Sequence, residues 1–303
     1  MESALREGSR ATGLRLIETL RWQDGGCRLL DRHLARLAAG AAALGWPCDR
    51  GAALAALRAA GGGGALRLRL TLAATGDIAV TSAPLPPAVA LWRLGVADVR
   101  LRSDDPWLRL KSTNRASYDT ARATLPAGLD EVVFLNERAE MCDGSISTLF
   151  FDRGQGMCTP PLTCGLLPGV LRADLLDRGC IEQVLRADDL GRVRLWLGNA
   201  LRGLIPAALI RAALDPAALT PTHAIPTSAI PAASGSAALD PAALIPTSAI
   251  PAGSGSAALD PAALIPTSAI PAASGSAALD PDALGPQDDA PPPGGDAVAG
   301  KPG

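Results

Sequence analysis

Hydrophobic and polar residues alternate along residues 14–22, LRLIETLRW, with the period of two that is typical of a β-strand. Apolar residues recur at helical spacing along residues 31–44, which predicts an amphipathic helix. Asp31 is placed to cap its N-terminus, and Gly45 is placed to end it. The same reasoning predicts a second helix over residues 49–60, which runs into four glycines.

The chain then continues as a mixture of strands and helices. The turn signal Thr75-Gly76-Asp77 separates two apolar runs and predicts a hairpin of residues 66–71 and 78–81. Further strands are predicted at residues 89–94, 108–111, 131–135, 146–151 and 193–197, and further helices at residues 114–124, 170–178 and 187–190. Such a mixture in two layers predicts an α/β fold, or an α+β fold.

Prolines divide this part of the chain in two. Pro84, Pro86 and Pro87 form a short stiff segment between two groups of predicted elements. We expect it to separate a small α/β domain, residues 1–87, from a larger domain, residues 88–211.

The last segment, residues 212–303, differs in composition from the rest. The sequence AALDP recurs there with a period of 20, at Asp240, Asp260 and Asp280. A solenoid would explain the period, but each repeat has three prolines and no aromatic residue to close a core. The segment is therefore predicted to be a disordered, low-complexity tail rich in Ala, Pro, Ser and Gly.

Charge and composition exclude several classes of function. The first 211 residues carry 27 Lys and Arg against 22 Asp and Glu, without a basic stripe, which argues against nucleic acid as a partner. No apolar run reaches the ~18 residues that a membrane-spanning helix needs. The N-terminus lacks an apolar signal segment, and the six cysteines form no CxxC pair and share this part with a single histidine. We therefore expect a cytoplasmic protein without a metal site.

Lys111 is the first candidate for chemistry. It follows an apolar run and is one of only two lysines in the chain. A lysine that faces a cleft loses hydration, which lowers its pKa and makes the neutral amine a nucleophile for Schiff-base chemistry. Arginine cannot take that role. The alternative to a catalytic amine is an ordinary surface lysine, and a GC-rich genome that favours arginine would explain why lysine is rare.

Three further features could bind an anion or a cationic ring. GLLPGVLR, residues 165–172, is a loop that opens a helix, and the N–H groups of such an end suit a phosphate. Arg36 is a second candidate anion ligand, and the carboxylate of Asp143 could pair with a cationic ring nitrogen. The simpler alternatives are an ordinary loop, a solvated arginine and an Asp-Gly turn.

Taken in order, several motifs resemble those of the class IV pyridoxal-phosphate aminotransferases: LIETLR, HLARL, LKSTNR, DEVVFLNERAEMCDGSISTLF, GLLPGVLR and GNALRG. This family includes branched-chain aminotransferases, D-amino-acid aminotransferases and aminodeoxychorismate lyases. The resemblance covers residues 14–208 and none of the tail. It implies the fold type IV architecture with two domains, pyridoxal 5'-phosphate bound in the cleft between them, and a homodimer.

The resemblance also implies a role for each matching residue. Lys111 matches the lysine that forms the internal aldimine with pyridoxal phosphate and moves the proton of the substrate's Cα. Asp143 matches the acid that pairs with the pyridine nitrogen, which keeps the ring protonated as an electron sink. The residues that match the family's phosphate contacts are Arg36, the backbone of Val170 and Leu171, and Asn199.

The chain departs from the family pattern at three places. The pattern has Glu at the position of Asp143 and usually Asn at that of Thr148. Most relatives also carry another strand and hairpin before LIETLR. A carboxylate that is one methylene shorter changes the geometry at the ring, and small displacements reduce rates strongly. A catalytically inactive member of the family is therefore one hypothesis.

Two active hypotheses share the loss of the Cα proton and differ in the fate of the carbanion. The first is an aminotransferase that moves an amino group from a small, branched-chain type of amino acid to a 2-oxo acid. The alternative is a 4-amino-4-deoxychorismate lyase that releases pyruvate and 4-aminobenzoate. The short body and the Asn199-Ala-Leu motif favour the lyase.

Overall fold

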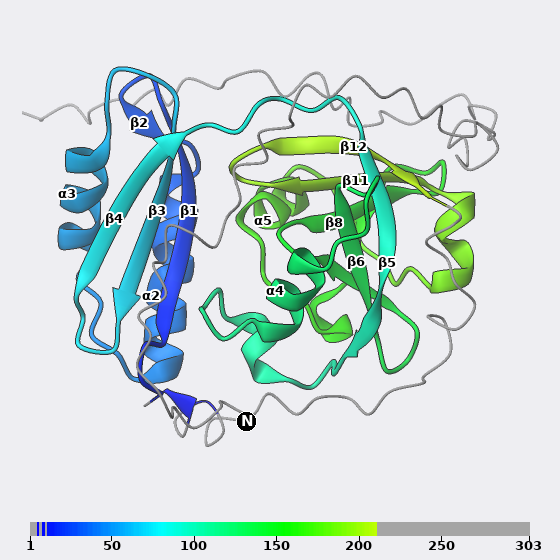
Figure 1. Cartoon of the computed structure of the whole chain (residues 1–303), viewed down its shortest axis with the longest axis horizontal. Coiled ribbons are helices and arrows are strands. Elements are labelled where there is room, and N and C mark those ends of the chain that lie inside the picture. The colour runs from blue at the N-terminus through cyan, green and yellow to red at the C-terminus, as the bar shows by residue number, and fades with distance from the viewer. Residues whose placement is uncertain (1–4, 6–7, 10, 211–303) are drawn as a thin grey trace, which may run out of the picture.

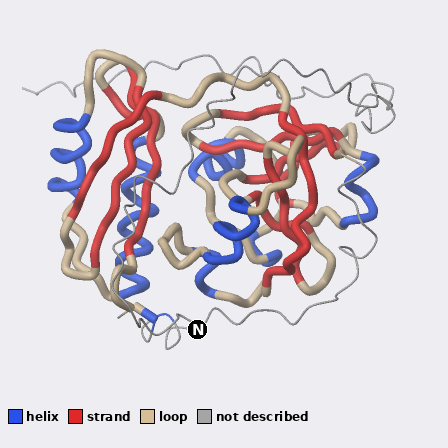
Figure 2. Tube along the Cα trace, in the orientation of Figure 1, coloured by secondary structure: helices blue, strands red, loops and turns tan. Residues whose placement is uncertain are grey.

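Two β-sheets, each with its own helices, make up the protein in a computed structural model that describes residues 5, 8–9 and 11–210 (Figure 1). The predicted tail, residues 212–303, lies outside the described residues. We call residues 11–84, with the first sheet, the first lobe, and residues 92–210, with the second sheet, the second lobe. Residues 85–91 join them without helix or strand (Figure 2).

The first lobe is a four-stranded antiparallel sheet in the order β2-β1-β3-β4, with two helices. Its elements are β1 (Arg15–Gln23), β2 (Gly26–Cys27), α2 (Leu30–Leu44), α3 (Arg50–Ala60), β3 (Leu66–Ala73) and β4 (Ile78–Pro84). In the register of β1 and β3, Leu16 opposes Leu72 and Leu20 opposes Leu68. These leucines join residues of both helices in one buried cluster, as alternation along β1 predicts.

The helix ends follow the sequence signals in part. Gly45 ends α2 in the left-handed conformation, with φ of 71°, as predicted. The prediction of Asp31 as the N-cap is wrong, because Leu29 occupies that position and Asp31 lies in the first turn. An acid there still interacts favourably with the helix dipole. Asp49 caps α3, since its side chain accepts the backbone N–H of Ala52.

The second lobe is an eight-stranded mixed sheet in the order β10-β9-β8-β11-β12-β5-β6-β7. Its strands are β5 (Trp92–Leu101), β6 (Glu131–Asn136), β7 (Met141–Gly144), β8 (Thr148–Asp152), β9 (Met157–Thr159), β10 (Ile181–Glu182), β11 (Arg194–Asn199) and β12 (Gly203–Leu209). The helices are η1 (Pro106–Arg109), α4 (Ala116–Ala123), η2 (Leu162–Cys164), α5 (Val170–Asp177) and η3 (Ala187–Arg192). The predicted mixed α/β fold is therefore confirmed.

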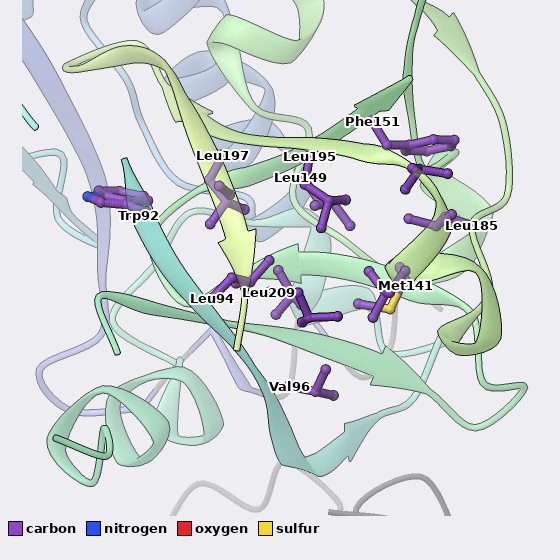
Figure 3. Close-up of a cluster of buried hydrophobic side chains, with 14 of the residues drawn as sticks. Trp92, Leu94, Val96, Met141, Leu149, Phe151, Leu185, Leu195, Leu197 and Leu209 are labelled. Carbon is purple, nitrogen blue, oxygen red and sulfur yellow. The ribbon is translucent and has the colours of Figure 1, made fainter. Parts of the chain in front are cut away.

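Side chains of several strands form the largest core of the second lobe. Leu94, Leu149, Phe151 and Leu197 are at most 1% exposed in it, and Figure 3 shows them packed together. A second cluster, around the fully buried Phe134, packs against α4. The strands of the second lobe are therefore held in place by close-packed side chains.

One predicted element is wrong, and several short strands were not predicted. Residues 108–111 do not form a strand, because residues 106–109 form the short helix η1. This short helix forms for local reasons: Pro106 suits a first helical turn, and the Asp105 carboxylate accepts the N–H of Trp107. The strands β2, β7, β9 and β10 have two to four residues each, too few to show a period. The seven-residue strand β12 contains Gly203 and Pro206, which are unfavourable in a strand.

Candidate active site

Lys111 follows η1 and lies along an edge of the first sheet. Its carbonyl accepts the N–H of Ile17 at 2.8 Å, and the N–H of Thr113 donates to the carbonyl of Arg15 at 2.9 Å. Leu16 and Ser112 form an isolated antiparallel bridge. A segment of the second lobe thus extends the sheet of the first lobe, and this pairing fixes the backbone of Lys111.

The amine of Lys111 lies in an environment that resists its protonation. Burial, and then the guanidinium groups of Arg36 and Arg115, lower the pKa of Lys111 to about 7, against an opposing effect of Glu18. The lysine, Arg36 and Glu18 line the same small cavity between β1 and α2. An amine with such a pKa is partly neutral at neutral pH and is a competent nucleophile or base.

Arg36 extends from α2 between the two lobes. Its Nε and Nη2 donate to the carboxylate of Glu18, and its Nη1 donates to the carbonyl oxygen of Pro168 at 3.2 Å. Pro168 belongs to the loop Gly165–Gly169 that precedes α5. A cation of the first lobe is therefore bound to the loop at the start of a helix in the second lobe.

The N-terminus of α5 is suited to bind an anion. Gly169 is its N-cap, no side chain of the described residues caps this end, and the first turn has no acidic residue. The backbone N–H groups of Val170 and Leu171 lie at this end, where the helix dipole favours negative charge. A Cβ on Gly169 would lie 2.6 Å from Oγ1 of Thr148, so this position needs a glycine. Together with Arg36, this end forms a candidate phosphate site.

Asp143 is a buried residue of β7, 5% exposed, and does not lie in a turn. One carboxylate oxygen accepts the hydroxyl of Tyr118 at 3.0 Å, and the other accepts the N–H of Leu167 at 3.1 Å. Burial raises the pKa of Asp143 to about 7, although both hydrogen bonds oppose the rise. A cationic ring nitrogen beside this carboxylate would favour its ionised form.

One loop connects the separate candidates. Leu167 contacts Asp143, and the next residue, Pro168, contacts Arg36. The charge of Arg115 acts on both Lys111 and Asp143. The structure therefore brings together an amine, a buried acid and an anion site that are far apart in sequence.

Asn199, the remaining predicted contact, uses its side chain within the protein. Its Oδ1 accepts the N–H groups of Leu201 and Arg202, and its Nδ2 donates to the carbonyl of Ile146. Its neighbour Gly198 packs against Leu171 of α5. The role of Asn199 as a phosphate contact stays a prediction.

Sequence reasoning missed three residues of the site: Glu18, His33 and Tyr118. Glu18 had a signal, because it is an acid on the face of β1 that is otherwise apolar. His33 is the one histidine among the first 211 residues. Tyr118 could not be found from the sequence, because no pattern in it predicts a contact between Tyr118 and Asp143.

Two other kinds of functional feature are absent from the described residues. They contain no group of three or more His, Cys, Asp or Glu that could hold a metal ion. No helix within them is long and apolar enough to cross a membrane.

The fold and the candidate site point to a class of protein: two α/β lobes that meet near a lysine, a buried acid and a helix N-terminus suited to an anion. The class IV aminotransferase family model matches residues 15–210, which contain all of these groups. The chain therefore belongs to the class IV aminotransferase family, as the resemblance predicted, and enzymes of this family use pyridoxal phosphate.

Known proteins of this family are similar to the chain. A crystal structure from Mesorhizobium loti, described as a putative amino-acid aminotransferase, is 45% identical with a TM-score of 0.63, over 65% of this chain and 100% of that one. A fold IV transaminase from Curtobacterium pusillum is 26% identical with a TM-score of 0.58, over 64% and 76%. A Schizosaccharomyces pombe protein named putative aminodeoxychorismate lyase is 29% identical over 199 residues, 62% of this chain and 86% of that protein.

Proposed function

We propose that the chain is a pyridoxal-phosphate-dependent aminotransferase that moves an amino group from a small amino acid, of the branched-chain type, to a 2-oxo acid. The observation that carries the proposal is the loop in which Leu167 holds Asp143 and Pro168 holds Arg36, beside Lys111. The 45% identity to the Mesorhizobium loti protein supports the same reaction class.

The residues present fit the cofactor. Arg36 and the first N–H groups of α5 would hold its phosphate, Asp143 its ring nitrogen, and Lys111 its aldehyde carbon. The start of α5 has no side-chain cap, and burial raises the pKa of Asp143 to about 7 despite the charge of Arg115. A phosphate and a cationic ring nitrogen would supply opposite charge at these two places. The bound cofactor supplies an electron sink for the negative charge that develops at the substrate's Cα.

The chain's own groups would position and move the proton. Nζ of Lys111, which is partly neutral at neutral pH, would accept the Cα proton and return it. Tyr118 and the N–H of Leu167 fix the carboxylate of Asp143. Asp143 would then pair with the ring nitrogen although its side chain is one methylene shorter than the family's usual Glu. Arg36 would anchor the phosphate end while the other end reacts.

The proposal is tested by incubation with pyridoxal phosphate, reduction with borohydride, and mass spectrometry of the peptides. We expect a stable adduct on Lys111 and none in the variant Lys111→Ala. The wild-type protein should also exchange the Cα proton of amino acids in D₂O, and Asp143→Asn should slow this exchange while it still binds the cofactor. A folded wild-type protein without an adduct would refute the proposal and favour an inactive family member.

The second candidate is the lyase on 4-amino-4-deoxychorismate, which the similarity to the Schizosaccharomyces pombe protein favours. Release of pyruvate and 4-aminobenzoate without a 2-oxo acid would identify it, whereas the transaminase requires an oxo acid to complete its cycle. The homodimer implied by the resemblance stays a prediction, which light scattering on the purified protein would test.

A further inference from the structure

A buried acidic residue of β1 takes no step in the proposed chemistry. Glu18 is 1% exposed and lies between Leu16 and Leu20, on the face that packs against α2. An ionised carboxylate is costly to bury unless it is paired and hydrogen-bonded. The partners of Glu18 therefore indicate its role.

Both oxygens of Glu18 are bound by side chains of α2. Arg36 donates its Nε–H to Oε1 at 2.8 Å and its Nη2–H to Oε2 at 2.6 Å, which forms a bidentate pair. The Nδ1 of His33 lies 2.6 Å from Oε2, and His33 is three residues before Arg36 on the same helix face. Glu18 thus holds one edge of the guanidinium group.

The other edge of Arg36 is directed at the second lobe. Nη1 donates to the carbonyl of Pro168 at 3.2 Å, and α5 begins two residues later at Val170. Two parallel hydrogen bonds fix the plane of a guanidinium group, because the group is rigid and flat. The direction of Nη1 is therefore set by Glu18.

The charges in this cluster are balanced. Burial alone would raise the pKa of Glu18, but the charge of Arg36 and the hydrogen bond of His33 outweigh it and lower the pKa to about 2. Burial lowers the pKa of His33, so the ring is neutral at pH 7. It donates Nδ1–H to an oxygen that can only accept, and its Nε2 has no hydrogen-bond partner among the described residues.

We propose that Glu18, supported by His33, is a positioning residue for the cofactor phosphate, because it directs the Nη1 edge of Arg36 to the N-terminus of α5. This inference rests on the proposed function and adds to it a group that acts through Arg36. Without Glu18 the cation would remain, but it would have to be ordered when the phosphate binds. A merely structural Glu18 would instead hold α2 to β1 and have no bearing on phosphate.

The test compares the affinities of the apoprotein for pyridoxal phosphate and for pyridoxal, which lacks only the phosphate. Glu18→Gln preserves the size of the side chain but removes its charge and turns one acceptor into a donor. We expect the Kd for pyridoxal phosphate to rise at least about tenfold, as for one charge-assisted hydrogen bond, and the Kd for pyridoxal to change less than about twofold. The ratio of the two Kd values is the readout.

Three controls separate positioning from folding. Asp130→Asn breaks a bidentate pair with Arg93 in the second lobe and should leave the ratio unchanged. Glu18→Gln should have no further effect on the ratio in an Arg36→Met background. His33→Asn keeps a hydrogen-bond donor near the position of Nδ1 and should preserve the ratio. His33→Leu removes the donor and should lower the preference for pyridoxal phosphate over pyridoxal. If Glu18→Gln does not fold, His33→Leu takes its place in the test.

The outcomes are distinct. A lower preference for pyridoxal phosphate in Glu18→Gln and His33→Leu, absent in the Arg36→Met background, supports the inference. An equal loss of both affinities, or an unchanged ratio, overturns it and leaves the proposed function intact. If the wild-type protein does not itself prefer pyridoxal phosphate to pyridoxal, the proposed phosphate site fails and the inference fails with it.

Discussion

The amine of Lys111 is expected to titrate near neutrality in the cofactor-free protein. Its pKa falls from 10.5 to about 7, mainly by burial and then by the charges of Arg36 and Arg115. At pH 7 about half of these amines would be neutral, whereas roughly one in 2,500 is neutral for a lysine with a pKa of about 10.4. The structure therefore predicts a roughly thousandfold larger neutral fraction for Lys111.

Arg115→Gln tests the electrostatic part of this shift. The variant removes one of the neighbouring cations, so the pKa of Lys111 should rise, but it should stay below 10.5 because burial is the largest cause. The matched control is Arg50→Gln, since Arg50 is an exposed residue paired with Asp31. We expect the control to leave the pKa of Lys111 unchanged.

Trace labelling with acetic anhydride from pH 5 to 11, read by mass spectrometry, measures the neutral fraction directly. The chain has only two lysines, so the labelled peptides are simple to assign, and a synthetic peptide with the sequence around Lys301 supplies the reference. A midpoint for Lys111 near that of the reference peptide would refute the reasoning. So would an Arg115→Gln variant in which the midpoint falls.

Three further predictions concern stability and the buried acid. Lys111→Met should raise the free energy of unfolding at pH 7 and below, because the folded chain no longer holds an amine that resists protonation. Urea unfolding should show this gain shrink as pH rises from about 7 to 10.5, where the unfolded wild-type chain loses its extra proton, and a gain independent of pH would contradict the sign. Tyr118→Phe removes a hydrogen bond that lowers the pKa of Asp143, so carboxyl NMR of the apoprotein should find that pKa above about 7. Phe134 is a fully buried ring whose centroid lies 4.9 Å from that of Tyr118, edge to face. Phe134→Ala should lower the free energy of unfolding, measured in urea, by about 3–5 kcal/mol. A loss within experimental error would contradict the packing.

Local patterns predicted the parts of the fold that depend on local causes. The alternation along β1 and the helical period along α2 are consequences of one buried face, and both elements form where expected. The end of α2 at Gly45 follows from the left-handed conformation that glycine adopts easily. The strand prediction for residues 108–111 failed because Leu-Arg-Leu-Lys is too short to distinguish a strand from a helical turn, and Pro106 favours the turn.

The contacts that complete the site could not be predicted, because they join residues far apart in sequence. Arg36 meets Pro168 across 132 positions, and Tyr118 meets Asp143 across 25. The family resemblance named one residue of each pair and gave no indication of its partner. Glu18 was quoted within a family motif, but only the structure shows that it binds Arg36.

The site and the contact between the lobes are built from the same atoms. The N–H of Ile17 binds the carbonyl of Lys111, and Nη1 of Arg36 binds the carbonyl of Pro168; each bond joins one lobe to the other. Docking of the lobes therefore fixes the backbone of the candidate nucleophile and the direction of the candidate phosphate ligand at the same time. Because Leu167 also fixes Asp143, a displacement of this loop by about 1 Å would disturb the phosphate end and the ring end together, and errors of that size reduce rates strongly. The arrangement of the two lobes is thus itself part of the proposed catalytic machinery.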